Sequence, residues 1–183
     1  MKEFKIVKDN KKSLRERSVD ISLPLTQEIK ELGNDMLKYL ILSQDEDYLK
    51  KHKNIRSGVG LAAPQIGKNI NLIAIYFIDE NEKENKYVLV NPKIISESTK
   101  QCYLKNGEGC LSVDKEHPGY IYRPYKIKVK AFDLLNDKEI ILDLKGYSAI
   151  VAQHEIDHLK GILFYDHINK LEPFKEEIGA IAI

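Results

Sequence analysis

The first regular pattern of hydrophobic positions along the chain has the spacing of a helix. Apolar side chains recur every three or four residues at Leu25, Ile29, Leu32, Met36 and Leu40. This spacing places them on one helix face. Thr26 belongs to the residue types that cap helix N-termini. The sequence therefore predicts an amphipathic helix over about residues 26–43, with an extension to about residue 53, after an irregular arm over residues 1–24.

A second pattern, short apolar runs separated by polar turns, predicts strands. Such runs occupy residues 71–79, 87–96, 99–104, 120–135 and 140–146. In the fourth run, Ile127, Val129 and Ala131 alternate with lysines, which predicts a strand with one buried face. Because the connections between runs are short and polar, we expect antiparallel sheets.

Two glycine-bearing segments follow neither period and are predicted as loops. They are residues 56–69, "RSGVGLAAPQIGKN", and residues 106–112, "NGEGCLS". A second helix is predicted over residues 148–160, "SAIVAQHEIDHLK". Ser148 would be its N-cap, and Gly161 would end it.

The amino-acid composition indicates a folded globular protein. The chain has 183 residues, of which 43% are hydrophobic and 31% are charged, as in a folded globular domain. We expect one α+β catalytic domain over residues 1–183, with antiparallel β-sheets packed around the second helix and the N-terminal helix added to them. Residues 162–168 would form a short strand, and the apolar segment 178–183 would form an extra edge strand.

The net charge and the N-terminal sequence indicate which binding partners and which cellular location to expect. The formal net charge of +1 produces no large field of one sign that would attract nucleic acid or an anionic membrane. The lysine run at Lys50, Lys51 and Lys53 is predicted to be a solvated face. The first residues are too charged for an apolar signal core, and no apolar run reaches the ~18 residues of a membrane helix. We therefore expect a cytoplasmic protein that binds neither nucleic acid nor membranes, with a monomer as the default oligomeric state.

The predicted second helix carries two histidines with a metal-binding spacing. His154 and His158 lie at positions i and i+4, so both imidazoles share one helix face. Neutral imidazole binds borderline divalent metals. Glu155 lies beside the pair, where a carboxylate can accept a proton from metal-bound water and deliver it to a leaving group. The alternative is a pair of histidines that are satisfied in the core or at the surface without a metal.

A catalytic metal site needs a third protein ligand and one open position. The candidates are the carboxylates and Cys102, Cys110, His52, His117 and His167. Cys110 is preferred because Gly109 beside it permits a close approach to a ligand, and because a thiolate is the stronger metal ligand. Cys102 lies in a predicted strand and is expected to be an inert core residue. Two cysteines do not predict a disulfide framework in a chain of this length.

Three segments together resemble the motifs of the peptide deformylases, in that family's order. They are "GVGLAAPQ" at residues 58–65, "EGCLS" at residues 108–112 and "QHEIDHL" at residues 153–159. The combination is highly specific, and the similarity runs through most of the chain. The wording "RSGVGLAAPQ" and the longer segment before it resemble the longer, Gram-positive-type form of the family.

The resemblance implies a reaction, a cofactor and a partner. The reaction is hydrolysis of the N-formyl group from the N-terminal formylmethionine of newly synthesised bacterial proteins, with formate as a product. The partner would be the formylated nascent polypeptide at the ribosome. One divalent metal ion, Fe(II) first and zinc, nickel or cobalt as substitutes, would be held by Cys110, His154 and His158. Glu155 would be the general acid and base.

The resemblance also implies roles for residues around the metal. The Gln65 amide and the Leu111 backbone N–H would stabilise the oxyanion; without the resemblance, Gln65 would be a loop residue bonded to its own backbone. Residues expected to contact the substrate are Val59, Gly60, Leu61, Gly109, Tyr147, Ile150 and Val151. The first three would pair with the extended substrate backbone. Ile150 and Val151 would line a slot for methionine, with Tyr147 and Val59 near it; core packing is the alternative for Ile150 and Val151. Glu108 could anchor the loop around Cys110; the alternative is a solvated loop carboxylate.

The chemistry of these residues alone also permits two other functions. A zinc peptidase would explain the histidines and the glutamate of the predicted second helix. It would not explain the segments at residues 58–65 and 108–112. A non-catalytic metal-binding module would have a closed four-ligand site, with His117 as the fourth ligand. A closed site leaves no position for water, so Glu155 would then have no purpose.

Overall fold

The computed structural model describes residues 4–183, so the first three residues of the predicted arm lie outside the described residues. Within that range the helices are α1 (Gln27–Ser43), α2 (Glu46–Lys51) and α3 (Tyr147–Leu159). The strands are β1 (Gly60–Ala62), β2 (Leu72–Ile78), β3 (Glu84–Glu97), β4 (Gln101–Tyr103), β5 (Arg123–Pro124), β6 (Lys126–Asp133), β7 (Lys138–Lys145) and β8 (Ile181–Ala182). None of the helices in residues 4–183 has both the length and the apolar character to cross a membrane.

The strands form two sheets. The larger has the order β1-β2-β3-β6-β7, and all its neighbours pair antiparallel, as the short connections predict. The smaller has the order β5-β4-β8 and contains one parallel pair, because β8 runs in the same direction as β4. The apolar segment 178–183 thus supplies an edge strand, as expected.

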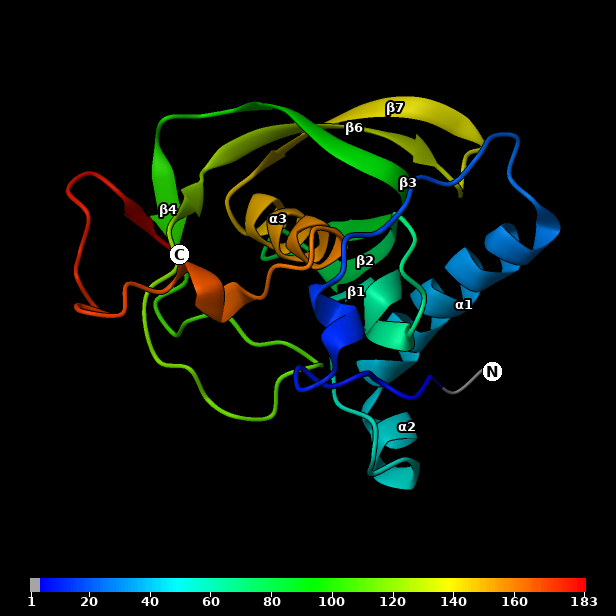
Figure 1. The fold of residues 1–183 in the computed structure, drawn as a ribbon, viewed down its shortest axis with the longest axis horizontal. Helices are drawn as coiled ribbons and strands as arrows, with labels where there is room; N and C mark the ends of the chain where they lie inside the picture. The colour runs from blue at the N-terminus through cyan, green and yellow to red at the C-terminus, as the bar shows by residue number, and fades with distance from the viewer. Residues whose placement is uncertain (1–3) are drawn as a thin grey trace.

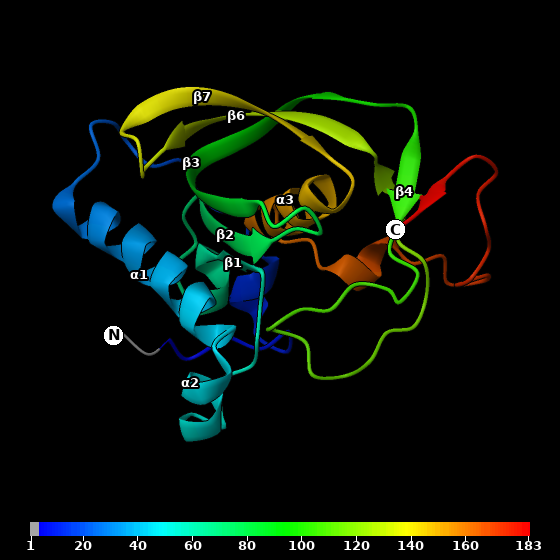
Figure 2. The ribbon, with the colours of Figure 1, turned by 180° about the vertical axis from the view of Figure 1, so that it is seen from behind.

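A helix packs on each face of the larger sheet, which explains the nearly continuous apolar run of β2. Ile73 and Ile75 belong to the core that the sheet shares with α3, whereas Leu72 and Ala74 belong to the core that it shares with α1. Figures 1 and 2 show α3 and α1 on the two sides of β2. Packing against β1 and β2 fixes α3, and with it the two histidines.

The N-terminal helix forms as predicted, but its extension does not. At the start of α1, the Thr26 hydroxyl accepts a hydrogen bond from the backbone N–H of Ile29. The helix ends at Ser43, and the Asp45 carboxylate accepts a hydrogen bond from the backbone N–H of Tyr48 at 2.8 Å. The predicted continuation is wrong because Asp45 caps a separate helix, α2.

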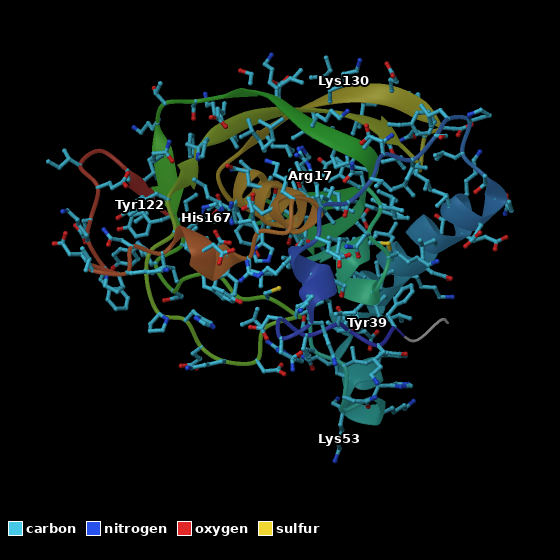
Figure 3. All side chains as sticks on the ribbon, in the orientation of Figure 1. Arg17, Tyr39, Lys53, Tyr122, Lys130 and His167 are labelled. Carbon is cyan, nitrogen blue, oxygen red and sulfur yellow. The ribbon has the colours of Figure 1, made fainter. Side chains whose placement is uncertain are left out.

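The lysines that were predicted to face solvent do so. Exposed lysines near α2 are Lys50, Lys51 and Lys53. On β6 the inward side chains Ile127, Val129 and Ala131 are buried, and the lysines that alternate with them are exposed. Figure 3 shows Lys53 pointing away beyond α2 and Lys130 at the outer side of the larger sheet.

Two predicted segments are organised differently. Part of the first glycine-bearing segment is regular, because Gly60–Ala62 (β1) pairs with β2 and Ala63–Ile66 forms a 3-10 turn. The run predicted as one strand over residues 120–135 divides at Tyr125. Its first part, β5, pairs with β4 in the smaller sheet, and its second part, β6, pairs with β3 and β7 in the larger.

Two predictions next to α3 were wrong. The N-cap of α3 is Gly146 and not Ser148. Gly146 has a φ of 58°, which favours glycine, and this conformation turns the chain from β7 directly into the helix. Residues 162–168 contain the 3-10 turn Phe164–His167 instead of a strand. The Asp166 carboxylate closes that turn by accepting a hydrogen bond from the Leu163 N–H at 2.8 Å.

Candidate metal centre and active site

The three predicted metal ligands lie together. α3 supplies His154 and His158, and the connection between β4 and β5 supplies Cys110. The Cys110 sulfur lies 3.2 Å from His158 Nε2, and one ligand atom of each residue lies within 4.8 Å of the other two. Within residues 4–183, no other group of three histidine, cysteine or acidic side chains converges in this way.

A buried ion-pair network orients His154. The Glu108 carboxylate lies 2.8 Å from His154 Nδ1, which directs the other ring nitrogen away from Glu108. Arg123 donates two hydrogen bonds to Glu108, at 2.6 and 3.0 Å, and a third to Asp157 at 2.8 Å. Burial by itself would raise the pKa of Glu108, but hydrogen bonds from His154 and Arg123 hold it below its ordinary value. The expected anchor of the Cys110 loop is thus an ionised Glu108 held by β5.

Sequence reasoning missed Arg123 and Asp157. The sequence held one indication of a buried Arg123. Arg123 lies two positions after Ile121 in a strand-like run, so both side chains point to the same, inward face of the strand. Both side chains are buried, with exposures of 4% for Arg123 and 2% for Ile121. A charged residue in the apolar phase of such a run needs a buried partner. The sequence does not say which partner, since Glu108 and Asp157 come from other elements.

The surroundings of the three side chains suit a divalent metal. The Cys110 sulfur accepts hydrogen bonds from the Ser112 N–H at 3.4 Å and from Gln65 Nε2 at 3.5 Å, as a thiolate can. Burial lowers the pKa of His158 well below its ordinary value, so its imidazole is in the neutral, ligating form. Burial opposes protonation of His154, yet Cys110 and Glu108 raise its pKa. Cys110 and Glu108 therefore favour positive charge at the place where a cation would lie.

Glu155 is positioned beside these ligands without being tied to them. Its side chain is 4% exposed, and its Oε2 has no hydrogen-bond partner among residues 4–183. Burial raises the pKa of Glu155 to about 7. A carboxyl with a free oxygen and such a pKa can accept and release a proton near neutral pH.

Gly60 leaves the room that Glu155 occupies. A β-carbon built on Gly60 would lie 2.6 Å from Glu155 Cδ, far inside contact distance. Gly60→Ala is therefore expected to displace the carboxyl and to lower kcat by about 100-fold, the order of loss for a misplacement of 1 Å. The measurement is turnover, at saturating substrate, of the deformylation that the resemblance implies. Metal content should stay that of the wild type; loss of metal would show that the change reaches beyond Glu155.

Gln65 makes the local backbone contact of one reading, and its amide nitrogen faces the Cys110 loop. Its Oε1 accepts a hydrogen bond from the Ala62 N–H at 2.8 Å, which is the local backbone contact. Its Nε2 nevertheless points to the second motif, 3.2 Å from the Ser112 hydroxyl and 3.5 Å from the Cys110 sulfur. The local bond locks the amide so that its N–H groups face the site.

A cavity of about 260 Å³ opens beside these residues. Predicted residues that line it are Val59, Gly60, Gln65, Gly109, Cys110, Leu111, Tyr147, Ile150, Val151, His154 and Glu155. Two predicted residues do not line it. His158 is buried and lies with Cys110 and His154, and Leu61 is fully buried in the core shared with α1. β1 is an edge strand of the larger sheet, so its outer edge can accept an extended peptide.

The other candidate ligands lie elsewhere. His167 Nε2 contacts Asp157 at 2.8 Å, and His117 stacks on Tyr165. His52 lies at the end of α2. Cys102 is fully buried in β4, and burial raises the pKa of its thiol to about 11, as expected for an inert core cysteine. His117 is absent from the converging group in residues 4–183, so the arrangement does not favour a closed four-ligand module.

Comparison with known sequences identifies relatives of the chain. The sequence family described as Polypeptide deformylase matches residues 3–174. A peptide deformylase of Listeria monocytogenes serovar 1/2a is 51% identical over 168 residues, which cover 92% of this chain and 91% of the relative. A peptide deformylase of Macrococcus caseolyticus is 48% identical over 181 residues, which cover 97% and 96%.

Solved structures agree with this relationship. A probable peptide deformylase from Synechococcus phage S-SSM7 has a TM-score of 0.74 and 34% identity, over 91% of this chain and all (100%) of that chain. The Met-Ala-Ser-bound class I type b peptide deformylase from Acinetobacter baumannii has a TM-score of 0.70 and 28% identity, over 90% and 98% of the two chains. The chain belongs to the polypeptide deformylase family.

Proposed function

We propose that this protein hydrolyses the N-formyl group from the N-terminal formylmethionine of newly synthesised proteins and releases formate. The observation that carries the proposal is the convergence of three distant segments on one cavity. Cys110 and His154 line it together with Glu155 and Gln65, and His158 converges with the first two. The Acinetobacter baumannii relative binds Met-Ala-Ser, a peptide that begins with the methionine such a reaction would free.

The metal in this proposal is a divalent ion held by Cys110, His154 and His158, with Fe(II) as the natural ion and zinc, nickel or cobalt as possible substitutes. Three protein ligands leave a coordination position open. When bound, such an ion lowers the pKa of a water molecule and polarises a carbonyl oxygen. Glu108 would hold His154 in the orientation that the ion needs.

The proton moves through Glu155 in this proposal. As the attacking water loses a proton, the free Oε2 of Glu155 accepts it, and the same carboxyl then delivers it to the departing amine nitrogen. One water is consumed, and formate and a free amine are formed. Negative charge builds on the formyl oxygen, where the Gln65 amide and the Leu111 N–H donate hydrogen bonds.

The substrate lies along the edge of the larger sheet. Val59 and Gly60, with the backbone of Leu61, would pair with the extended peptide as an added strand, and Gly109 would let it lie close to the Cys110 loop. The methionine side chain would enter the apolar part of the cavity. Its walls are Tyr147, Ile150 and Val151.

The cellular setting follows from the substrate. The protein would act as a single catalytic domain and a monomer, in the cytoplasm, on formylated chains as they leave the ribosome. Both cysteines are free thiols, in keeping with a reducing compartment.

The decisive assay measures formate release from formyl-Met-Ala-Ser by protein loaded anaerobically with Fe(II) or with Ni(II). Release of one formate per peptide is expected, with no cleavage of unformylated Met-Ala-Ser. Cleavage of an internal amide bond would instead favour the zinc peptidase. Metal-loaded protein that releases no formate would refute the proposal.

A further inference from the structure

The N-terminal arm is hydrogen-bonded to two of the three motifs. The Val7 N–H donates to the Gln65 carbonyl at 2.8 Å, and the Asp9 N–H donates to the Ser112 carbonyl at 3.0 Å. In Figure 1 the dark-blue arm meets the green connection between β4 and β5 below α3. Residues 7–9 therefore connect the loop of Gln65, whose amide is the proposed oxyanion donor, to the loop of Cys110.

Lys8 makes the most specific contact in this arm. Its ammonium donates a hydrogen bond to the Leu111 carbonyl at 3.1 Å. The same ammonium contacts the Asp114 carboxylate at 2.7 Å, and its side chain is 38% exposed. One cation thus bridges the backbone and a side chain of the Cys110 loop.

The Leu111 carbonyl belongs to the peptide group whose N–H is that of Ser112. That N–H donates to the Cys110 sulfur at 3.4 Å. A cation on the carbonyl end of a peptide group polarises it, and the N–H at the other end becomes a stronger donor. The ammonium, the peptide group and the sulfur form one chain of hydrogen bonds.

We propose that Lys8 is a positioning residue for the metal site, which acts through the Leu111–Ser112 peptide group on the Cys110 sulfur. It holds that peptide plane in the orientation in which its N–H meets the sulfur. It also stabilises negative charge on the sulfur from outside the cavity. Groups that orient a ligand in this way contribute to metal affinity although they never touch the ion.

The competing explanation is that Lys8 only ties down the loop through its ion pair with Asp114. That pair is exposed, with 65% exposure of the Asp114 side chain, and exposed pairs contribute little. Arg56 also contacts Asp114, at 3.0 Å, so the loop keeps one ion pair when Lys8 is changed. Asp114→Asn removes the ion pair and leaves the contact between Lys8 and the Leu111 carbonyl.

The test measures Co(II) affinity of the full-length protein by competition with a chelator, together with the absorption band from thiolate to Co(II). Lys8→Met is expected to weaken Co(II) binding about tenfold and to shift the band. Lys8→Arg, which keeps a charged donor, should restore both. Asp114→Asn and the exposed Lys5→Met should stay within about twofold of the wild type, because in both the carbonyl contact survives.

Two results would overturn the inference. One is a Lys8→Met protein with unchanged affinity and an unchanged band. The other is an Asp114→Asn protein that loses as much affinity as Lys8→Met, since the ion pair would then be responsible. The inference rests on the proposed role of Cys110 as a ligand. A wild-type protein without any thiolate-to-Co(II) band would refute that role and the inference together, whereas a normal wild-type band with no effect of Lys8→Met refutes the inference alone.

Discussion

Glu155→Ala is expected to remove nearly all formate release while the protein keeps its metal. We expect kcat to fall by about 10²–10⁴-fold, which is the typical contribution of a positioned general acid and base. Glu155 lies beside the three converging side chains but is not one of them, and its Oε2 has no partner among residues 4–183. Its removal therefore takes away the proposed proton carrier and leaves the three proposed ligands intact. The measurements are turnover of formyl-Met-Ala-Ser and metal content after dialysis.

Glu155→Gln is the matched variant for this prediction. Glutamine keeps the shape that packs against Gly60 but cannot carry the proton. An equal loss in both variants would assign the effect to chemistry, and activity retained by glutamine would assign it to packing. Loss of metal in either variant would instead make Glu155 a ligand or a structural residue.

Cys110→Ser is expected to have the second large effect, on metal binding itself. A hydroxyl is a much poorer ligand than a thiolate for borderline metals. Gln65 and the Ser112 N–H would also lose the sulfur that they contact. Metal affinity should fall by well over the 10–100-fold seen for groups outside the ligand set, and the thiolate-to-Co(II) band should disappear.

Cys102→Ala supplies the control for Cys110→Ser. Cys102 is also buried, in β4, but it is not part of the converging group. Its replacement should leave the affinity and the absorption band unchanged, at some cost in thermal stability from the smaller side chain. Unchanged metal binding in Cys110→Ser would rule out the cysteine as the third ligand.

Local sequence patterns predicted the helices and strands that are determined by their own residues. The spacing of apolar residues and the cap at Thr26 were enough for α1, and alternation was enough for β6. The i, i+4 histidines and the glycine-bearing loop around Cys110 marked the side chains that come together, because helix geometry and glycine act locally.

The features that were missed depend on contacts between distant segments. The division at Tyr125 depends on two different partner strands, since β5 pairs with β4 and β6 pairs with β3. The Gly146 cap depends on a turn conformation that no side-chain pattern reports. Arg123 finds Glu108 and Asp157 only in the folded chain. Propensity and periodicity carry no information on such partners.

The separation between Cys110 and His158, 48 positions along the chain, has a consequence for how the protein matures. An unfolded chain must close a long loop before the ligands meet, so no partial product of synthesis that lacks α3 can hold the ion. If these side chains hold a divalent ion, the free energy of its binding is added to the stability of the complete fold and of no shorter chain that lacks α3.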